Sequence, residues 1–104
     1  LVKSNQAAKH MTVGKFYLNE KKYTAALNRY KIVIEKYSET KFTPEALHRI
    51  VEIYYEIGLK EEANNTASVL GYNYPDSKWY KYSYNLIKEN KNDKSLLDSI
   101  KNIF

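Results

Sequence analysis

The sequence contains no cysteine, only three glycines and two prolines, and no long hydrophobic run. Without cysteine, the chain has no disulfide, no thiolate metal ligand and no cysteine nucleophile. So few glycines and prolines argue against an all-β fold with many tight turns. No apolar segment approaches the ~20 residues that span a bilayer. The basic excess is mild, with 17 Lys and Arg against 12 Asp and Glu. It predicts solubility, and nucleic-acid binding would need this charge gathered on one face.

Apolar residues recur at helical spacing along most of the chain and predict six helical segments. They are expected at 2–18, 24–37, 44–57, 60–70, from Trp79 onward after a cap at Asp76 or Ser77, and at 95–104 beyond the polar stretch KENKND. Thr43 is predicted to cap the third helix ahead of Pro44. Gly58 is predicted to end that helix in the left-handed conformation, and Gly71 to end the fourth.

The first two hairpins align when the sequence is shifted by 37 residues. This places His10 on Leu47, Val13 on Ile50, Gly14 on Val51, Tyr17 on Tyr54 and Ala26 on Ala63. Within each copy the spacing follows the tetratricopeptide pattern, whose usual period is about 34 residues. Trp79, Tyr82, Ser83 and Leu86 restart the series. We therefore predict an all-α solenoid of five to six antiparallel helices, with one repeat at 7–40, a second at 44–75 and a partial repeat or cap at 76–104.

Residues that could support catalysis or hold a cofactor are scarce. His10 and His48 lack further ligands at metal-binding spacing, and Glu52 with Glu56 is typical of a solvated helix face. The sequence also lacks a glycine-rich phosphate loop and a nucleophile elbow. We expect no enzymatic activity, no cofactor and no metal.

Several stretches are more specific than the repeat pattern: NRY, KYSET, TPEALHRIVEIYYEIGL and NYPDSKWY. Over residues 9–88 the chain resembles the C-terminal half of the BamD (ComL) family, tetratricopeptide lipoproteins of the bacterial outer-membrane β-barrel assembly machine. The resemblance implies a scaffold at the periplasmic face of the outer membrane. It also implies docking to the last POTRA domain of BamA and contact with accessory lipoproteins. The family's lipid-bearing cysteine is absent here, so we expect a C-terminal fragment whose full-length protein is anchored by an N-terminal lipid.

Four residues are predicted to bind protein partners. By resemblance, Arg29 in NRY reaches a POTRA carboxylate, with Asn28 beside it. Tyr80 and Tyr84, like Tyr72 and Tyr74, are not explained by the apolar stripes and are predicted to line an interface, where tyrosine is favoured.

Two other functions remain open from the residues alone. One is a different periplasmic tetratricopeptide adaptor, of the Tol-associated type, and the other is a cytosolic repeat protein that binds peptide tails. The upstream sequence would separate them: an export signal ending in a lipid-acceptor cysteine favours the assembly scaffold, a coiled-coil segment favours the Tol-associated type, and no export signal favours the peptide binder. No nucleic-acid partner is expected.

Overall fold

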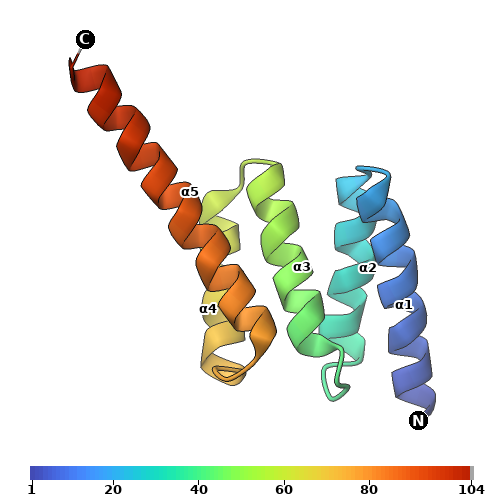
Figure 1. The fold of residues 1–104 in the computed structure, drawn as a ribbon. Helices are drawn as coiled ribbons and strands as arrows, with labels where there is room; N and C mark the ends of the chain where they lie inside the picture. Colours follow the sequence, from blue (N-terminus) through green and yellow to red (C-terminus); the bar gives the residue numbers. More distant parts are fainter. Residues whose placement is uncertain (104) are drawn as a thin grey trace.

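The computed structural model describes the backbone of residues 1–103 and the side chains of residues 1–90. Every regular element in this part of the chain is an α-helix (Figure 1). The helices are α1 (Val2–Asn19), α2 (Tyr23–Lys36), α3 (Thr43–Glu56), α4 (Lys60–Asn73) and α5 (Lys78–Ile103). Helices α1 and α2 form one hairpin, α3 and α4 form a second beside it, and α5 packs on both α3 and α4. The predicted all-α solenoid is confirmed.

The turns inside the two hairpins have the same backbone geometry. Lys21 has a φ of 59° and Gly58, 37 residues later, a φ of 86°, so both adopt the left-handed conformation. Each turn is closed by the same hydrogen bond, from the Lys22 N–H to the Tyr17 carbonyl and from the Leu59 N–H to the Tyr54 carbonyl. This is the Schellman motif, which satisfies carbonyl groups at a helix end. The 37-residue spacing found in the side chains therefore recurs in the backbone, and the role predicted for Gly58 is confirmed.

Matching small and large side chains pack the helices of each hairpin together. Tyr30 of α2, which is only 1% exposed, lies against Gly14 of α1. A Cβ atom at Gly14 would lie 2.9 Å from Tyr30 Cζ. In the second hairpin the sizes are exchanged, because Val51 of α3 packs with Ala67 of α4. In both hairpins a small residue thus faces a larger one, with the small residue on α1 in the first hairpin and on α4 in the second.

Two predictions about α3 and α4 are wrong. Helix α4 does not end at Gly71 but continues to Asn73. Gly71 allows a close approach instead, since a Cβ there would lie 2.5 Å from Cε1 of Tyr80 on α5. Thr43 is the first residue of α3, and Phe42 takes the cap position without a side-chain cap hydrogen bond. The Thr43 hydroxyl donates to the Ser38 carbonyl at 2.9 Å, which ties α3 to the preceding loop.

Helix α5 begins as predicted, because the Trp79 N–H donates to Ser77 Oγ at 3.1 Å in an N-terminal cap. The predicted break at KENKND is wrong, since α5 runs without interruption from Lys78 to Ile103. This segment contains neither glycine nor proline, and its lysine and glutamate residues favour helix. The predicted cap at Ser95 with Asp98, and the apolar side chains at 96–103, lie outside the described side chains.

Candidate functional site

Arg29 of α2 reaches across the first hairpin to His10 of α1. Its Nη1 lies 3.2 Å from His10 Nδ1, and the His10 ring stacks on Tyr37 with 5.8 Å between ring centroids. Burial lowers the pKa of His10, and the charges of Arg29 and Lys36 lower it further. The imidazole is therefore neutral at pH 7, so Nδ1 can accept a hydrogen bond from the guanidinium. Arg29 is partly buried, and the contact with His10 orients its guanidinium.

Arg29 differs from Arg49 in its charged neighbours. No acidic side chain in the described part of the chain lies within 4.0 Å of the Arg29 guanidinium, whereas Arg49 is paired with both Glu45 and Glu52. Asn28, next to Arg29, is exposed. A guanidinium binds a carboxylate through two parallel N–H donors. The oriented Arg29 guanidinium can therefore donate hydrogen bonds to a carboxylate that lies outside this part of the chain.

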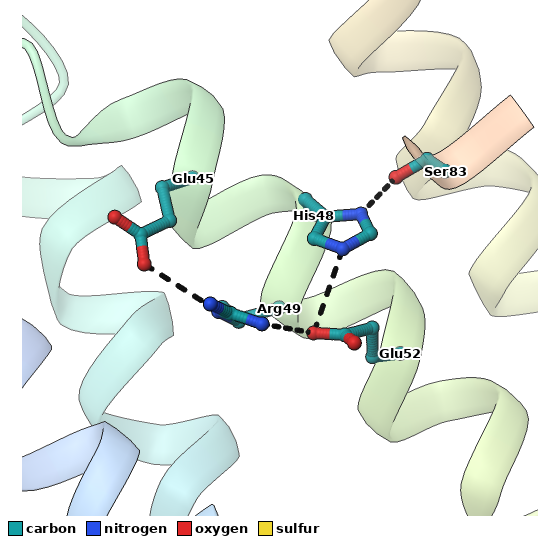
Figure 2. A network of polar contacts seen from close by, with 5 residues as sticks. All are labelled: Glu45, His48, Arg49, Glu52 and Ser83. Carbon is teal, nitrogen blue, oxygen red and sulfur yellow. Dashed lines mark hydrogen bonds and ion pairs between the residues drawn. The ribbon is translucent and has the colours of Figure 1, made fainter. Parts of the chain in front are cut away.

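A second polar cluster lies along α3 (Figure 2). Arg49 Nη1 donates to Glu52 Oε1 at 2.8 Å, and Arg49 Nε lies 3.4 Å from Glu45 Oε2. Nε is buried and makes only this ion-pair contact, without a well-formed hydrogen bond. The guanidinium also covers the indole of Trp79 on α5, with Cζ 5.2 Å from the ring centroid. The cluster therefore joins α3 to α5 through a charged group on an aromatic face.

His48 completes this cluster. Its Nδ1 is hydrogen bonded to Ser83 Oγ of α5 at 2.7 Å, and its Nε2 lies 3.6 Å from Glu52 Oε1 (Figure 2). Burial lowers the pKa of His48, although the Glu52 carboxylate opposes the shift. The serine, histidine and glutamate have the composition of a hydrolytic triad. Ser83 is 0% exposed, however, so no substrate carbonyl can reach its hydroxyl. The hydrogen bond between His48 and the buried Ser83 therefore serves to link α3 to α5.

Part of this cluster could have been predicted from the sequence and part could not. Glu45, Arg49 and Glu52 are spaced i, i+4 and i+7 on one helix, which places ion pairs on the same face. This spacing could have been used to predict the ion pairs of Arg49 from the sequence. The contact between His48 and Ser83 joins residues 35 positions apart and depends on how α5 packs, so the sequence offered no signal for it.

Tyr80 and Tyr84 lie together on α5, with 6.3 Å between ring centroids. Tyr80 is partly buried against Gly71, whereas Tyr84 is 53% exposed. The two rings line a groove between α4 and α5 of about 440 Å³, together with Asn64, Ala67, Ser68, Ile87 and Lys88. Tyr80 thus has a packing role that the sequence did not indicate, and Tyr84 is the accessible ring.

The four predicted partner residues do not form one site. Asn28 and Arg29 belong to α2 in the first hairpin, whereas Tyr80 and Tyr84 belong to α5, on the far side of α3 (Figure 1). The structure therefore offers two candidate surfaces, one on the first hairpin and one between α4 and α5.

Neither a membrane span nor a metal site is found in the part of the chain that the structure describes. None of its helices combines the length and the apolar character needed to cross a bilayer. No three side chains of His, Asp or Glu in this part are grouped so that they could hold a metal ion.

Comparison with known proteins places the chain in a family. The family model YfiO, described as outer membrane lipoprotein, matches residues 1–70. "Outer membrane protein assembly factor BamD" of Rickettsia prowazekii (strain Madrid E) is 50% identical over 92 residues, which cover 88% of this chain and 37% of that protein. The protein of the same name from Caulobacter vibrioides is 46% identical over 90 residues, covering 86% of this chain and 30% of that protein. The one from Haemophilus influenzae is 32% identical over 72 residues.

These matches differ in whether they include α5. The family model ends at residue 70, before α5 begins. A match that covers 86% of the 104 residues leaves about 15 outside it, so the Caulobacter match includes residues 16–89 and with them most of the first half of α5. The chain spans about a third of the length of these relatives. The resemblance seen in the sequence is confirmed: the chain belongs to the YfiO family of outer membrane lipoproteins.

Proposed function

We propose that this chain is a non-catalytic scaffold of the machine that assembles outer membrane β-barrel proteins. It docks a POTRA domain of BamA and contacts accessory lipoproteins at the periplasmic face of the outer membrane. An N-terminal lipid on the full-length protein provides the anchor. The proposal is supported by the relatives' name, outer membrane protein assembly factor, and by the family description, outer membrane lipoprotein.

One observation carries the docking role of Arg29. Its guanidinium is oriented by a neutral histidine, and no carboxylate of the described residues pairs with it. One edge of the guanidinium contacts His10, which leaves the Nε and Nη2 donors for a bidentate contact with a partner carboxylate. Because the side chain is already oriented, it loses less conformational entropy on binding than a mobile surface arginine would. Asn28, exposed beside it, adds an amide for hydrogen bonds at the rim.

The packing of the solenoid supports the scaffold role. Tyr30 is wedged between hairpin helices, and Arg49 with His48 connects α3 to α5. Buried contacts of this kind hold the helices in fixed relative positions. Groups on different helices can then bind separate partners in a fixed geometry.

A binding titration with the purified POTRA domains of the cognate BamA tests the proposal. Arg29→Glu should weaken binding by roughly tenfold or more, because it removes the donor fork and places two carboxylates together. Arg29→Lys should give an intermediate loss, since an ammonium keeps the charge but not the bidentate geometry. Lys60→Glu makes the same charge change at an exposed position on α4 and should leave the affinity within about twofold.

Circular dichroism of all three variants controls for folding. If Arg29→Glu and Lys60→Glu weaken binding equally, the effect is general electrostatics and Arg29 has no docking role. If wild-type protein does not bind the POTRA domains at all, the proposed scaffold function is wrong.

A further inference from the structure

The face of α5 that carries Tyr84 is open, whereas the matching face of α3 is covered. On α3, Val51 is 0% exposed because α4 packs on it through Ala63 and Ala67. On α5, the Tyr84 ring is 53% exposed, and no later helix follows within residues 1–103. The exposed Tyr84 ring lines a groove with Ala67 and Ile87, and a contiguous apolar surface of this kind can serve as an interaction site.

A comparison of two grooves shows where a further helix could pack against the solenoid. Between α2 and α3, Leu47 and Tyr54 line a groove of about 300 Å³, and α4 closes its third side with Asn65, Thr66 and Val69. Between α4 and α5, Tyr80 and Ile87 line the corresponding groove. They stand 33 residues after Leu47 and Tyr54, so this register is one residue later than the one predicted from Trp79, Tyr82, Ser83 and Leu86. Within residues 1–90, the side chains that line this second groove all come from α4 and α5. Its third wall, which a helix supplies in the preceding groove, is open.

The described chain does not turn back to fill this position. After α3, Gly58 reverses the chain and α4 returns along Val51. The corresponding point on α5, 33 residues later, is residue 91, and α5 continues as one helix to Ile103. A helix that occupies the groove must therefore come from elsewhere than residues 1–103.

The lining of the groove indicates the chemistry of that helix. The floor is apolar and aromatic, made by Ala67, Tyr84 and Ile87, and Asn64 and Ser68 provide a neutral polar edge. Among the described side chains that line it, Lys88 is the one that carries a charge. In the preceding hairpin the covering helix α4 has Glu61 and Glu62 in its first turn. A helix lying on α5 as α4 lies on α3 would bring its own first turn close to Lys88, so acidic residues there are favoured by charge.

We propose that the α4–α5 groove binds an amphipathic helix of a partner protein, with small apolar residues on its inner face and an acidic first turn beside Lys88. The site is distinct from the Arg29 surface and goes beyond the proposed docking of a POTRA domain. Its α5 wall lies beyond the residues that the family model matches, in a segment shared with the Rickettsia and Caulobacter relatives. Helix-in-groove recognition uses the same i, i+3, i+4 apolar stripe that packs the solenoid itself.

The probe is a helix-constrained synthetic peptide with the sequence of residues 59–73, because α4 already covers the equivalent face of α3. It is titrated against the intact protein by fluorescence anisotropy. Tyr84→Ser should weaken binding at least about tenfold, as expected for an aromatic residue at the centre of an interface. Phe16→Ser, at a 59% exposed aromatic residue of α1 that does not line the groove, should leave the affinity unchanged.

A charge exchange tests the orientation of the bound helix. Lys88→Glu should weaken binding of the peptide about two- to fivefold, and a peptide with both glutamates replaced by lysine should bind Lys88→Glu better than wild type by a similar factor. Equal binding to wild type, Tyr84→Ser and Lys88→Glu would overturn the proposal, as would no binding at millimolar peptide. Sedimentation showing that wild-type chains self-associate and Tyr84→Ser chains do not would also overturn it, because the occupant would then be a second copy. None of these results depends on POTRA binding, so they leave the proposed function untouched.

Discussion

Replacing Gly71 with alanine should lower the free energy of unfolding when Tyr80 is present and raise it when Tyr80 is replaced by alanine. Gly71 lies inside α4, where alanine is favoured over glycine by about 1 kcal/mol. The structure opposes this gain, because the new Cβ would lie 2.5 Å from Cε1 and 2.7 Å from Cζ of Tyr80. Carbon atoms in favourable contact are about 3.5–4.0 Å apart. Tyr80 or the whole of α5 must therefore move by about 1 Å.

The two effects set the expected magnitudes. Overpacking of this size costs about 1–3 kcal/mol, and the partial exposure of Tyr80 places it at the lower end. In the wild-type background Gly71→Ala should therefore destabilise the protein by about 0–2 kcal/mol. In a Tyr80→Ala background the obstacle is gone, and the same change should stabilise by about 0.5–1 kcal/mol.

Urea unfolding of the four proteins, followed by circular dichroism, measures the coupling in a double-mutant cycle. We expect a coupling free energy of about 1–3 kcal/mol between positions 71 and 80. If Gly71→Ala stabilises both backgrounds equally, the Tyr80 ring does not rest on Gly71 and the packing of α5 on α4 described above is incorrect.

Three further predictions concern the hairpins and α3. Gly58→Lys should destabilise by about 1 kcal/mol, whereas Lys21→Gly should be neutral or stabilising, because both positions need a left-handed residue; equal urea midpoints would contradict this. Gly14→Ala should destabilise the protein, because Tyr30 is buried and cannot move aside. The overpacking costs about 1–3 kcal/mol, and the higher helix propensity of alanine offsets part of this cost. An unchanged melting temperature would contradict the prediction. Burial lowers the pKa of His48 from 6.5, so below that pH the unfolded chain binds more protons and stability should fall as the pH falls. His48→Asn should flatten this part of a urea-midpoint profile against pH, and a profile of unchanged slope would contradict the assignment.

The repeat was predictable because it is encoded in local patterns. Gly14 and Tyr30 in one hairpin, and Val51 and Ala67 in the next, share spacing even though their sizes are exchanged. Glycine at the turn of the second hairpin gave a direct signal. Lys21 at the same place in the first gave none, because a left-handed lysine is visible only in the backbone.

Other features depend on contacts between distant residues and could not be read from spacing. Gly71 resembles a helix stop in the sequence, yet it serves the approach of Tyr80 from another helix. At the candidate sites, the resemblance selected Arg29, but only the structure shows that His10 orients it. Tyr84 was singled out because no stripe explained it, and its exposure agrees with that reasoning.

The two candidate surfaces are held apart by one helix. Helix α3 contacts α2 on one side and both α4 and α5 on the other, so it sets the distance between Arg29 and Tyr84. On α3, Arg49 pairs with Glu45 and Glu52 and lies over the Trp79 ring, so it helps to hold α5 against α3. Arg29, in contrast, has no acidic partner among the described residues. The same residue type thus has two roles, decided by which carboxylates lie within reach. A change in α3 that loosens Arg49 should therefore disturb the relative placement of both surfaces, although it touches neither.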